Sequence, residues 1–249
     1  YVTAPQDCPY LENKVERKLF TALYGSNSSR LNNSLSKQGF RRSQNVLYRP
    51  SCSNCTACMS ARIPSKDFSP SKSQKRILSK NEDIVRTINP PLATDPQFEL
   101  FKNYINKRHS NGGMSDMDSD DFTSMIEETN VESKLIEYYI KRNSKLELIS
   151  FSLVDILDDG ISMVYSVFDP ELSDRSLGTY MILDHSNLAL EMNLEFVYLG
   201  YWVKGSSKMD YKRRFSPLEV FTNDKWTCAS KSKVTKIESH KHDQQKHGV

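Results

Sequence analysis

Residues 161–203 predict a strand, a loop, a helix and a second strand, and this order restricts the fold more than any other feature of the sequence. The flanking segments ISMVYSVFDP and EFVYLGYWV are rich in β-branched and aromatic residues, whereas LGTYMILDHSNLALEMN has the length and composition of a helix. Two strands of one sheet that are joined through a helix run parallel. Because further strands are predicted at KLIEYYIK and LELISFSLVDIL, we predict an α+β fold with a mixed sheet and helices.

The first 90 residues predict shorter elements. Apolar residues from Val15 to Leu23 recur at helical spacing before Gly25, which predicts a helix, and FRRSQNVLYRP predicts a strand that ends at Pro50. The stretch SPSKSQKRILSKNED opens with serine and predicts a capped helix. The proline-rich stretch INPPLATDP disfavours both helix and strand and marks a boundary. We therefore predict an N-terminal region over 1–90, a second domain over 91–227 and a disordered tail over 228–249.

Charge is distributed unevenly along the chain. Residues 1–90 carry 15 basic and 6 acidic side chains, whereas residues 91–200 carry 8 and 20. A chain of this kind concentrates positive potential on its N-terminal part, which suits a polyanionic partner, although charges can also segregate on solvated faces. No apolar run reaches the ~18 residues that a membrane span needs, and no signal-peptide pattern opens the sequence. We expect a cytoplasmic protein.

Three of the five cysteines stand at C-x2-C-x2-C spacing in CSNCTAC, residues 52–58. An odd, low number of clustered cysteines fits reduced thiols or metal ligands better than a secreted disulfide scaffold. Together with Cys8, they form a thiolate set that could hold zinc or an iron–sulfur cluster, although reduced, half-buried thiols without metal explain them as well. A catalytic cysteine would need a nearby base, which the sequence does not supply. The candidate metal ligands are Cys8, Cys52, Cys55 and Cys58.

The loop RSLGTY at 175–180 places glycine and small polar groups where the helix begins, and free N–H groups there favour an anion or a polarised carbonyl. This arrangement resembles the core of the GCN5-related acyltransferases, whose R-x-x-G-x-G/A loop receives a coenzyme pyrophosphate. Tyr180 stands where that pattern has a small residue, which argues against an acetyl-CoA-dependent N-acetyltransferase.

Several long motifs together resemble one family. GFRRSQNVLYRP (39–50), the cysteine cluster, GGMSDMD (112–118), SMVYSVFDPEL (162–172), SLGTYMILDH (176–185) and YLGYWVKGSSKMDYKRRFSPLE (198–219) are similar to the bacterial aspartate/glutamate leucyltransferases, relatives of the eukaryotic arginyl-tRNA-protein transferases. The resemblance implies transfer of leucine from leucyl-tRNA to an N-terminal Asp or Glu, which marks the protein for N-degron proteolysis. It also implies a GCN5-like domain with a smaller N-terminal extension that contains the cysteines. Transfer of arginine is an alternative within the same family.

The expected reaction is aminolysis of an ester that is already activated. Because an α-amino group titrates near ~7.7–8.0, a tenth or more of it is neutral at pH 7 and no strong base is essential. Alignment of amine and ester, with a donor for the oxyanion, can supply the acceleration without any cofactor. The candidates for the reacting centre are Tyr165, Asp169, Ser176, Gly178, Thr179 and Tyr201, with Asp169 expected to accept or orient the amine.

Two further tasks are the binding of the tRNA end and of the acceptor's acidic residue. The basic segment after residue 203 predicts a phosphate clamp, and an arginine of the RR or YRP motif is expected to bind the acceptor carboxylate. The substrate-binding candidates are Arg41, Arg42, Ser43, Tyr48, Arg49, Tyr180, Tyr198, Lys204, Lys208, Lys212 and Arg213. The non-enzymatic alternative is an RNA-binding module with a zinc-knuckle-like cysteine cluster.

Overall fold

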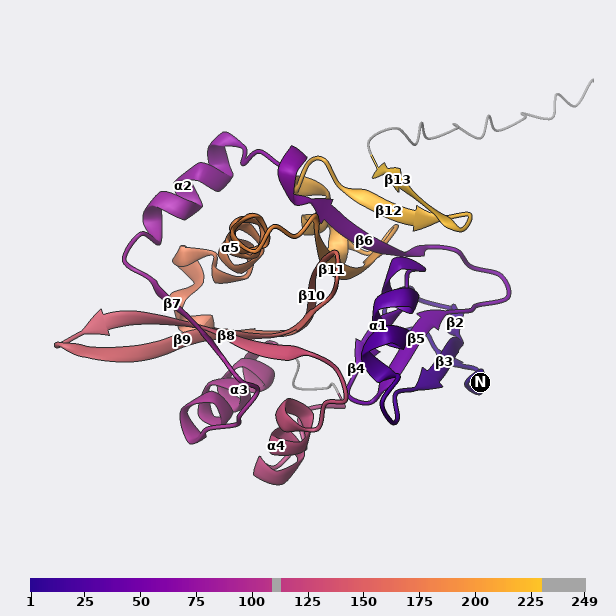
Figure 1. The fold of residues 1–249 in the computed structure, drawn as a ribbon, viewed down its shortest axis with the longest axis horizontal. Helices are drawn as coiled ribbons and strands as arrows, with labels where there is room; N and C mark the ends of the chain where they lie inside the picture. Colours follow the sequence, from indigo (N-terminus) through magenta and orange to yellow (C-terminus); the bar gives the residue numbers. More distant parts are fainter. Residues whose placement is uncertain (109–112, 230–249) are drawn as a thin grey trace, which may run out of the picture.

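An eight-stranded mixed sheet forms the centre of the molecule in the computed structural model, which describes residues 1–108 and 113–229 (Figure 1). The strand order is β13-β12-β6-β11-β10-β9-β8-β7. The bounds are β6 Cys58–Pro64, β7 Val85–Asn89, β8 Ser133–Arg142, β9 Lys145–Ile156, β10 Gly160–Phe168, β11 Phe196–Val203, β12 Glu219–Thr222 and β13 Lys225–Cys228. The α+β class with a large mixed sheet is therefore confirmed.

The parallel crossover lies at the middle of this sheet. β10 and β11 pair in parallel, and α5 (Leu177–Glu191) connects them after a short 3₁₀ helix, η2 (Pro170–Arg175). The apolar side chains of α5 pack on the sheet, with Met181 and Leu183 almost fully buried. The strand–helix–strand order predicted for residues 161–203 is confirmed. The apolar residues of α5 are covered by packing on a face of the sheet.

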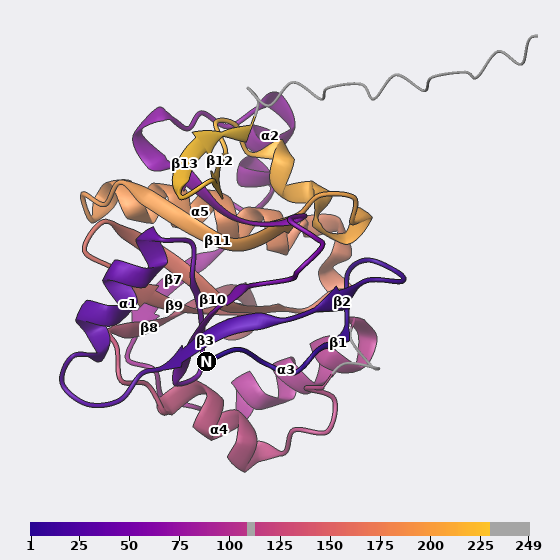
Figure 2. The same ribbon diagram turned by 90° about the vertical axis from the view of Figure 1, so that its right-hand side faces the viewer.

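Helices cover both faces of the sheet (Figures 1 and 2). α2 (Lys72–Lys80) and α5 lie on one face, and α3 (Asp95–Arg108) and α4 (Ser119–Glu127) lie on the other. The predicted serine cap of α2 is confirmed, because Ser71 Oγ accepts a hydrogen bond from the N–H of Gln74 in a capping box. Each face has its own apolar cluster, one around α5 and one around α3 and α4. None of the helices in the two described ranges has the length and apolar character that a membrane crossing requires.

The N-terminal residues form two small sheets and a helix beside the large sheet (Figure 2). β4 and β5 form a hairpin, and β3 pairs with β5. The bounds are β1 Gln6–Asp7, β2 Val15–Glu16, β3 Lys18–Ala22, α1 Ser28–Lys37, β4 Arg41–Ser43 and β5 Val46–Pro50, with 3₁₀ helices η1 Ser65–Asp67 and η3 Ser207–Arg214 farther along the chain. The helix predicted from Val15 to Leu23 is wrong: these residues form β2 and β3, since pairing with β5 outweighs a weak helical period.

The proline-rich stretch connects β7 to α3. β6 and β7 precede it in the chain, yet they hydrogen bond to strands that follow it, β6 with β11 and β7 with β8. β13 ends at Cys228, and the predicted tail lies outside the described residues from 230 onward.

Candidate functional site

The parallel strands β10 and β11 separate soon after they meet. The two strands pair over Gly160–Ser162 of β10 and Phe196–Tyr198 of β11. Each strand then continues past an irregularity, at Met163/Tyr165 in β10 and at Tyr198/Gly200 in β11. A split of this kind leaves backbone carbonyls without a ladder partner, and these groups need other donors.

Arg41 of β4 fills the split. Its Nη2 donates a hydrogen bond of 2.6 Å to the carbonyl of Val164 in β10. The same guanidinium lies directly against Gly200 of β11, where a Cβ would overlap it. Gly200 also has a φ of +71°, which favours glycine. The N-terminal region therefore contributes one arginine to the centre of the large sheet.

The Arg41 side chain is half-buried. Among the described residues, Arg41 forms no ion pair, and its guanidinium donates a hydrogen bond to the Val164 carbonyl. Lys212 lies nearby, almost fully buried, and its Nζ donates to the carbonyls of Leu199 and Tyr201 at 2.7 and 2.6 Å. Burial and then the Arg41 charge lower the pKa of Lys212 to about 7. Arg41 is a fixed cation and Lys212 is partly protonated at neutral pH, so together they form a site that attracts an anion.

Tyrosine hydroxyls connect this split to the N-terminal hairpin. Tyr165 of β10 and Ser43 of β4 share a hydrogen bond of 2.9 Å between their oxygens. Tyr201 donates to the carbonyl of Tyr48 at 2.7 Å, and the two rings lie 5.8 Å apart. Burial raises the pKa of Tyr201 far above its ordinary value. The structure thus brings together Arg41, Ser43, Tyr48, Tyr165, Tyr201 and Lys212, all predicted from the sequence. The Tyr201 hydroxyl, however, serves the backbone, so this placement does not support a role for it in the reaction.

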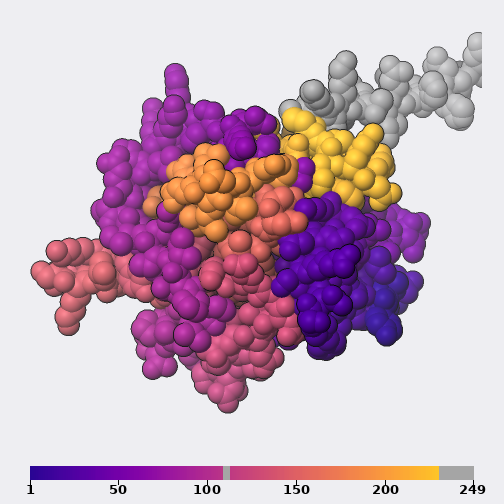
Figure 3. All heavy atoms as spheres, in the orientation of Figure 1, coloured from indigo at the N-terminus to yellow at the C-terminus, as the bar shows by residue number. Residues whose placement is uncertain are grey.

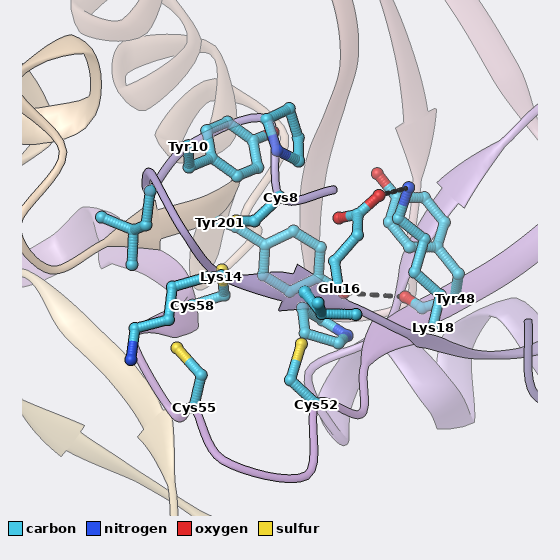
Figure 4. Close-up of a pocket in the computed structure, with 14 residues that line it drawn as sticks. Cys8, Tyr10, Lys14, Glu16, Lys18, Tyr48, Cys52, Cys55, Cys58 and Tyr201 are labelled. Carbon is cyan, nitrogen blue, oxygen red and sulfur yellow. Dashed lines mark hydrogen bonds and ion pairs between the residues drawn. The ribbon is translucent and has the colours of Figure 1, made fainter. Parts of the chain in front are cut away.

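The four candidate metal ligands line one pocket together with Tyr48 and Tyr201 (Figure 4). Cys8 comes from the loop between β1 and β2, Cys52 and Cys55 come from the loop before β6, and Cys58 begins β6. Burial, with the other three thiols, raises the pKa of Cys58 to about 12. The metal-free Cys58 thiol is therefore protonated at neutral pH and is a poor nucleophile.

The sulfurs converge without the arrangement of a metal site. In the described ranges, no group of three or more His, Cys, Asp and Glu side chains is placed to hold a metal ion. Zinc or an iron–sulfur cluster at these cysteines stays a prediction.

The start of α5 lies at the carboxyl end of β10. Ser176, with a φ of 53°, precedes the helix, and a Cβ on Gly178 would lie 3.2 Å from the ring of Phe168. Asp169 caps η2, because its Oδ1 accepts the N–H of Glu171 at 2.9 Å. Thr179 is half-buried in the first turn of α5. The Ser176 carbonyl already accepts the N–H groups of Thr179 and Tyr180, at 2.9 and 3.0 Å, so the donors that the sequence predicts here reduce to the N–H groups of Leu177 and Gly178.

Three predicted substrate-binding residues are buried in other roles. Arg42 forms a bidentate pair with Asp155, at 2.7 and 2.6 Å, and has an exposed fraction of 2%. Tyr180 packs edge-on against Tyr138 in the core. Tyr198 donates to Asp159 at 2.9 Å, at the closed end of the split. These placements do not support substrate contact, and they follow from alternation along a strand and helix, which turns neighbouring side chains to different sides.

The remaining basic candidates are Lys204, Lys208, Arg213 and Arg49. Lys204 and Lys208 are exposed, and Lys208 borders a surface pocket with Cys8, Tyr10 and Leu11. Arg213 lies over the ring of Trp202 at 5.7 Å. Arg49 lies over the ring of Phe40 at 5.1 Å and is half-buried.

Sequence reasoning missed Gly200, Tyr10 and Tyr211. Gly200 carries a signal, since an isolated glycine inside a strand pattern indicates a bulge or a close approach. Tyr10 and Tyr211 both lie near Arg41, whose charge opposes the rise that burial causes in the pKa of each. Nothing in the sequence marks either residue, because each reaches the site from a loop or an irregular segment.

Comparison with known proteins places the chain in a family. The family model described as "Arginine-tRNA-protein transferase, C terminus" matches residues 96–222, and the one described as "Arginine-tRNA-protein transferase, N terminus" matches residues 6–76. A similar relative is the aspartate/glutamate leucyltransferase of Ruegeria pomeroyi, which is 58% identical over 91% of this chain and 82% of its own length. That of Cereibacter sphaeroides is 52% identical over 96% and 86%.

Similarity to solved structures is much weaker. L-PGS from Bacillus licheniformis matches 61% of this chain and 48% of its own with a TM-score of 0.43 and 11% identity, from which nothing about fold or reaction follows. The relatives and both family models agree with the resemblance of the sequence motifs, which is thereby confirmed. The chain belongs to the aspartate/glutamate leucyltransferases, a family of aminoacyl-tRNA-protein transferase enzymes.

Proposed function

We propose that this enzyme transfers leucine from leucyl-tRNA to the N-terminal amine of proteins that begin with Asp or Glu. The names of relatives that are 52–58% identical support the donor and the acceptor. The observation that carries the proposal is the half-buried Arg41 in the split between β10 and β11, which forms no ion pair with any residue in 1–108 or 113–229. The crossover from β10 through α5 to β11 also resembles the core of the GCN5-related acyltransferases.

Arg41 is assigned to the acidic side chain of the acceptor. A guanidinium binds a carboxylate with two parallel hydrogen bonds, and one of its nitrogens is already fixed on Val164. The buried Lys212 adds positive potential beside it. A neutral or basic first residue would leave the half-buried cations without a partner, and that cost provides the selectivity.

The reaction needs no nucleophile from the enzyme. The neutral α-amine attacks the carbonyl carbon of the leucyl ester and forms the new C–N bond. The C–O bond to the terminal ribose then breaks, and the proton lost by the amine passes to the leaving ribose oxygen. Because the ester is already activated, holding these groups in line supplies most of the acceleration.

Three features are proposed to hold the reacting groups. Arg41 fixes the acceptor residue, whereas the N–H groups at the start of α5, around Gly178, stabilise the oxyanion or a terminal phosphate. The Tyr165 hydroxyl, held by Ser43, faces the same split from β10. Asp169 is proposed to orient the amine, with one carboxylate oxygen fixed by the N–H of Glu171. No cofactor takes part in this scheme.

The test is a transfer assay with the purified full chain. Leucyl-tRNA and arginyl-tRNA would each be supplied with peptides that begin with Asp, Glu, Lys or Ala. We expect leucine on the Asp and Glu peptides alone. Transfer of arginine in place of leucine to the same peptides would show that the donor is arginyl-tRNA and not leucyl-tRNA. Transfer to all four peptides, or labelling from acetyl-CoA, would contradict it. Tight RNA binding without any transfer would favour an RNA-binding module instead.

Gly200→Ala is predicted to impair acceptor use by displacing Arg41. The added Cβ overlaps the guanidinium, which can swing away because it is the end of a flexible side chain. We expect the KM for an Asp peptide to rise by about tenfold or more, with a loss of about 1 kcal/mol in unfolding free energy from the positive φ. The measurements are steady-state transfer kinetics and urea denaturation.

Gly25→Ala is the matched control. Gly25 has a φ of +75° and no atom within 4 Å of an added Cβ, so it carries the same backbone strain without a collision. We expect Gly25→Ala to lose similar stability and to keep the KM of the wild type. Equal KM values for the two variants would contradict the placement of Arg41 in acceptor binding.

A further inference from the structure

We propose that the exposed face of α2, formed by Lys72, Lys75 and Arg76, binds the phosphate backbone of the acceptor arm of the donor tRNA. This inference rests on the proposed function, because it names the surface by which the donor approaches the same site. α2 lies outside the motifs that suggested substrate binding, and no residue of it takes part in the reaction described above.

α2 has one buried face and one basic face. Gln74 and Asn81 are buried and Ile77 and Leu78 are half-buried, on the side that packs toward α5. Helical spacing places the three basic residues together on the opposite, exposed side. The helix itself contains no acidic residue. A stripe of cations along one face has the form of a backbone-binding surface.

The cations of this face are available. Among the described residues, Lys72, Lys75 and Arg76 form no ion pair, whereas Lys80 in the last turn pairs with Asp174 at 2.8 Å. Exposed lysine and arginine side chains without an internal partner keep their full charge for a polyanion. The face therefore carries three positive charges that form no ion pair within the described chain.

Buried amides fix both ends of α2 to the borders of the candidate site. Gln74 Nε2 donates to the carbonyl of Arg214 at the end of η3, at 3.1 Å. Asn81 Nδ2 donates to the carbonyl of Arg175 just before α5, at 2.9 Å. The basic face therefore lies at the end of α2 beside the exposed arginines of η3, and the helix runs from there toward the start of α5, where Lys80 pairs with Asp174; the surfaces of α2 and α5 adjoin in Figure 3. RNA bound along α2 would reach the first turn of α5 with its end.

The charge on the other side of the sheet sets the direction of approach. α4 lies on the face opposite α2 and begins with Asp118, Asp120 and Asp121 (Figure 1). A polyanion is repelled there and attracted to α2. Acidic protein would also be attracted, but a lysine stripe without an apolar centre lacks the buried anchors of a protein interface, whereas it suits phosphates.

The test compares two triple variants of the full chain. K72Q/K75Q/R76Q removes the three positive charges of the α2 face. K134Q/K141Q/K145Q removes three lysine charges of the β8–β9 hairpin and is the matched control. Binding of leucyl-tRNA would be measured from about 50 to 200 mM salt. We expect the first variant to bind about 10- to 100-fold more weakly near 0.15 M salt, with a salt slope smaller by about 2–3. The control should keep both values.

Transfer kinetics separate this proposal from the proposed function. If the wild type does not transfer leucine, the proposed function fails, whatever α2 does. If it does, we expect K72Q/K75Q/R76Q to raise the KM for leucyl-tRNA and to keep kcat at saturating tRNA. An unchanged tRNA KM with an unchanged salt slope would overturn the assignment of α2. A raised KM for the acidic peptide alone would show that the face binds acidic protein, which also overturns it. A melting temperature equal to that of the control variant shows that the face was altered without unfolding.

Discussion

Replacement of Arg41 by alanine is expected to lower kcat/KM for an Asp or Glu peptide by about 30- to 1,000-fold, which corresponds to about 2–4 kcal/mol of lost interaction. The variant removes the carboxylate partner and also leaves the Val164 carbonyl in the split without its donor. Steady-state kinetics with each substrate varied in turn provide the measurement. We expect kcat/KM for the peptide to fall and the KM for leucyl-tRNA to change little.

Two companion variants separate charge from geometry. Arg41→Lys keeps the charge but loses the planar fork, so we expect it to recover part of the activity of the alanine variant. Arg49→Ala is the control, since Arg49 lies on β5, where it stacks on Phe40 just before β4. We expect it to remain within a few-fold of the wild type. If Arg41→Ala impaired leucyl-tRNA and not the peptide, Arg41 would bind phosphate and the acceptor assignment would be wrong.

The centre of the fold could be predicted from the sequence because its signals are local and strong. The two strands around α5 each carry continuous apolar runs, and a helix between them allows few arrangements. The helix expected from Val15 to Leu23 failed for the opposite reason. β3 lies there, and its pairing with β5, residue Lys18 against Pro50, is formed with residues far along the chain. No window of the local sequence contains that partner.

The candidate site was predictable in outline but not in its roles. The RR pair drew attention to Arg41 and Arg42 equally, and only the structure separates them. Arg41 and Ser43 lie on one side of β4 and contact β10, whereas Arg42 lies on the other side and reaches Asp155. Alternation along a strand predicts that neighbours point to opposite sides, yet the sequence does not say which side holds the site. Gly200 was recognisable only as a glycine inside a strand.

Arg42→Ala is expected to cost about 3–5 kcal/mol of unfolding free energy, since it leaves a buried carboxylate without its charged partner. The Arg42–Asp155 pair is 1% exposed on each side chain, and Asp155 would retain only the Ser133 and Asn32 donors. Urea denaturation followed by circular dichroism gives the free energy. Arg142→Ala is the control, because its pair with Glu147 is exposed and such pairs contribute about 0–1 kcal/mol.

The double replacement Arg42→Met with Asp155→Leu tests the cause of that loss. Removing both charges abolishes the uncompensated carboxylate, so we expect the pair of changes to restore more than half of the stability lost in Arg42→Ala. If the double variant were as unstable as the single one, the loss would come from packing or from the neutral groups around the pair. Because β4 carries Arg41 on its other side, we expect the double variant to use the acceptor peptide like the wild type although Arg42 is absent. The two adjacent arginines would then be separated experimentally, one by kinetics and the other by stability.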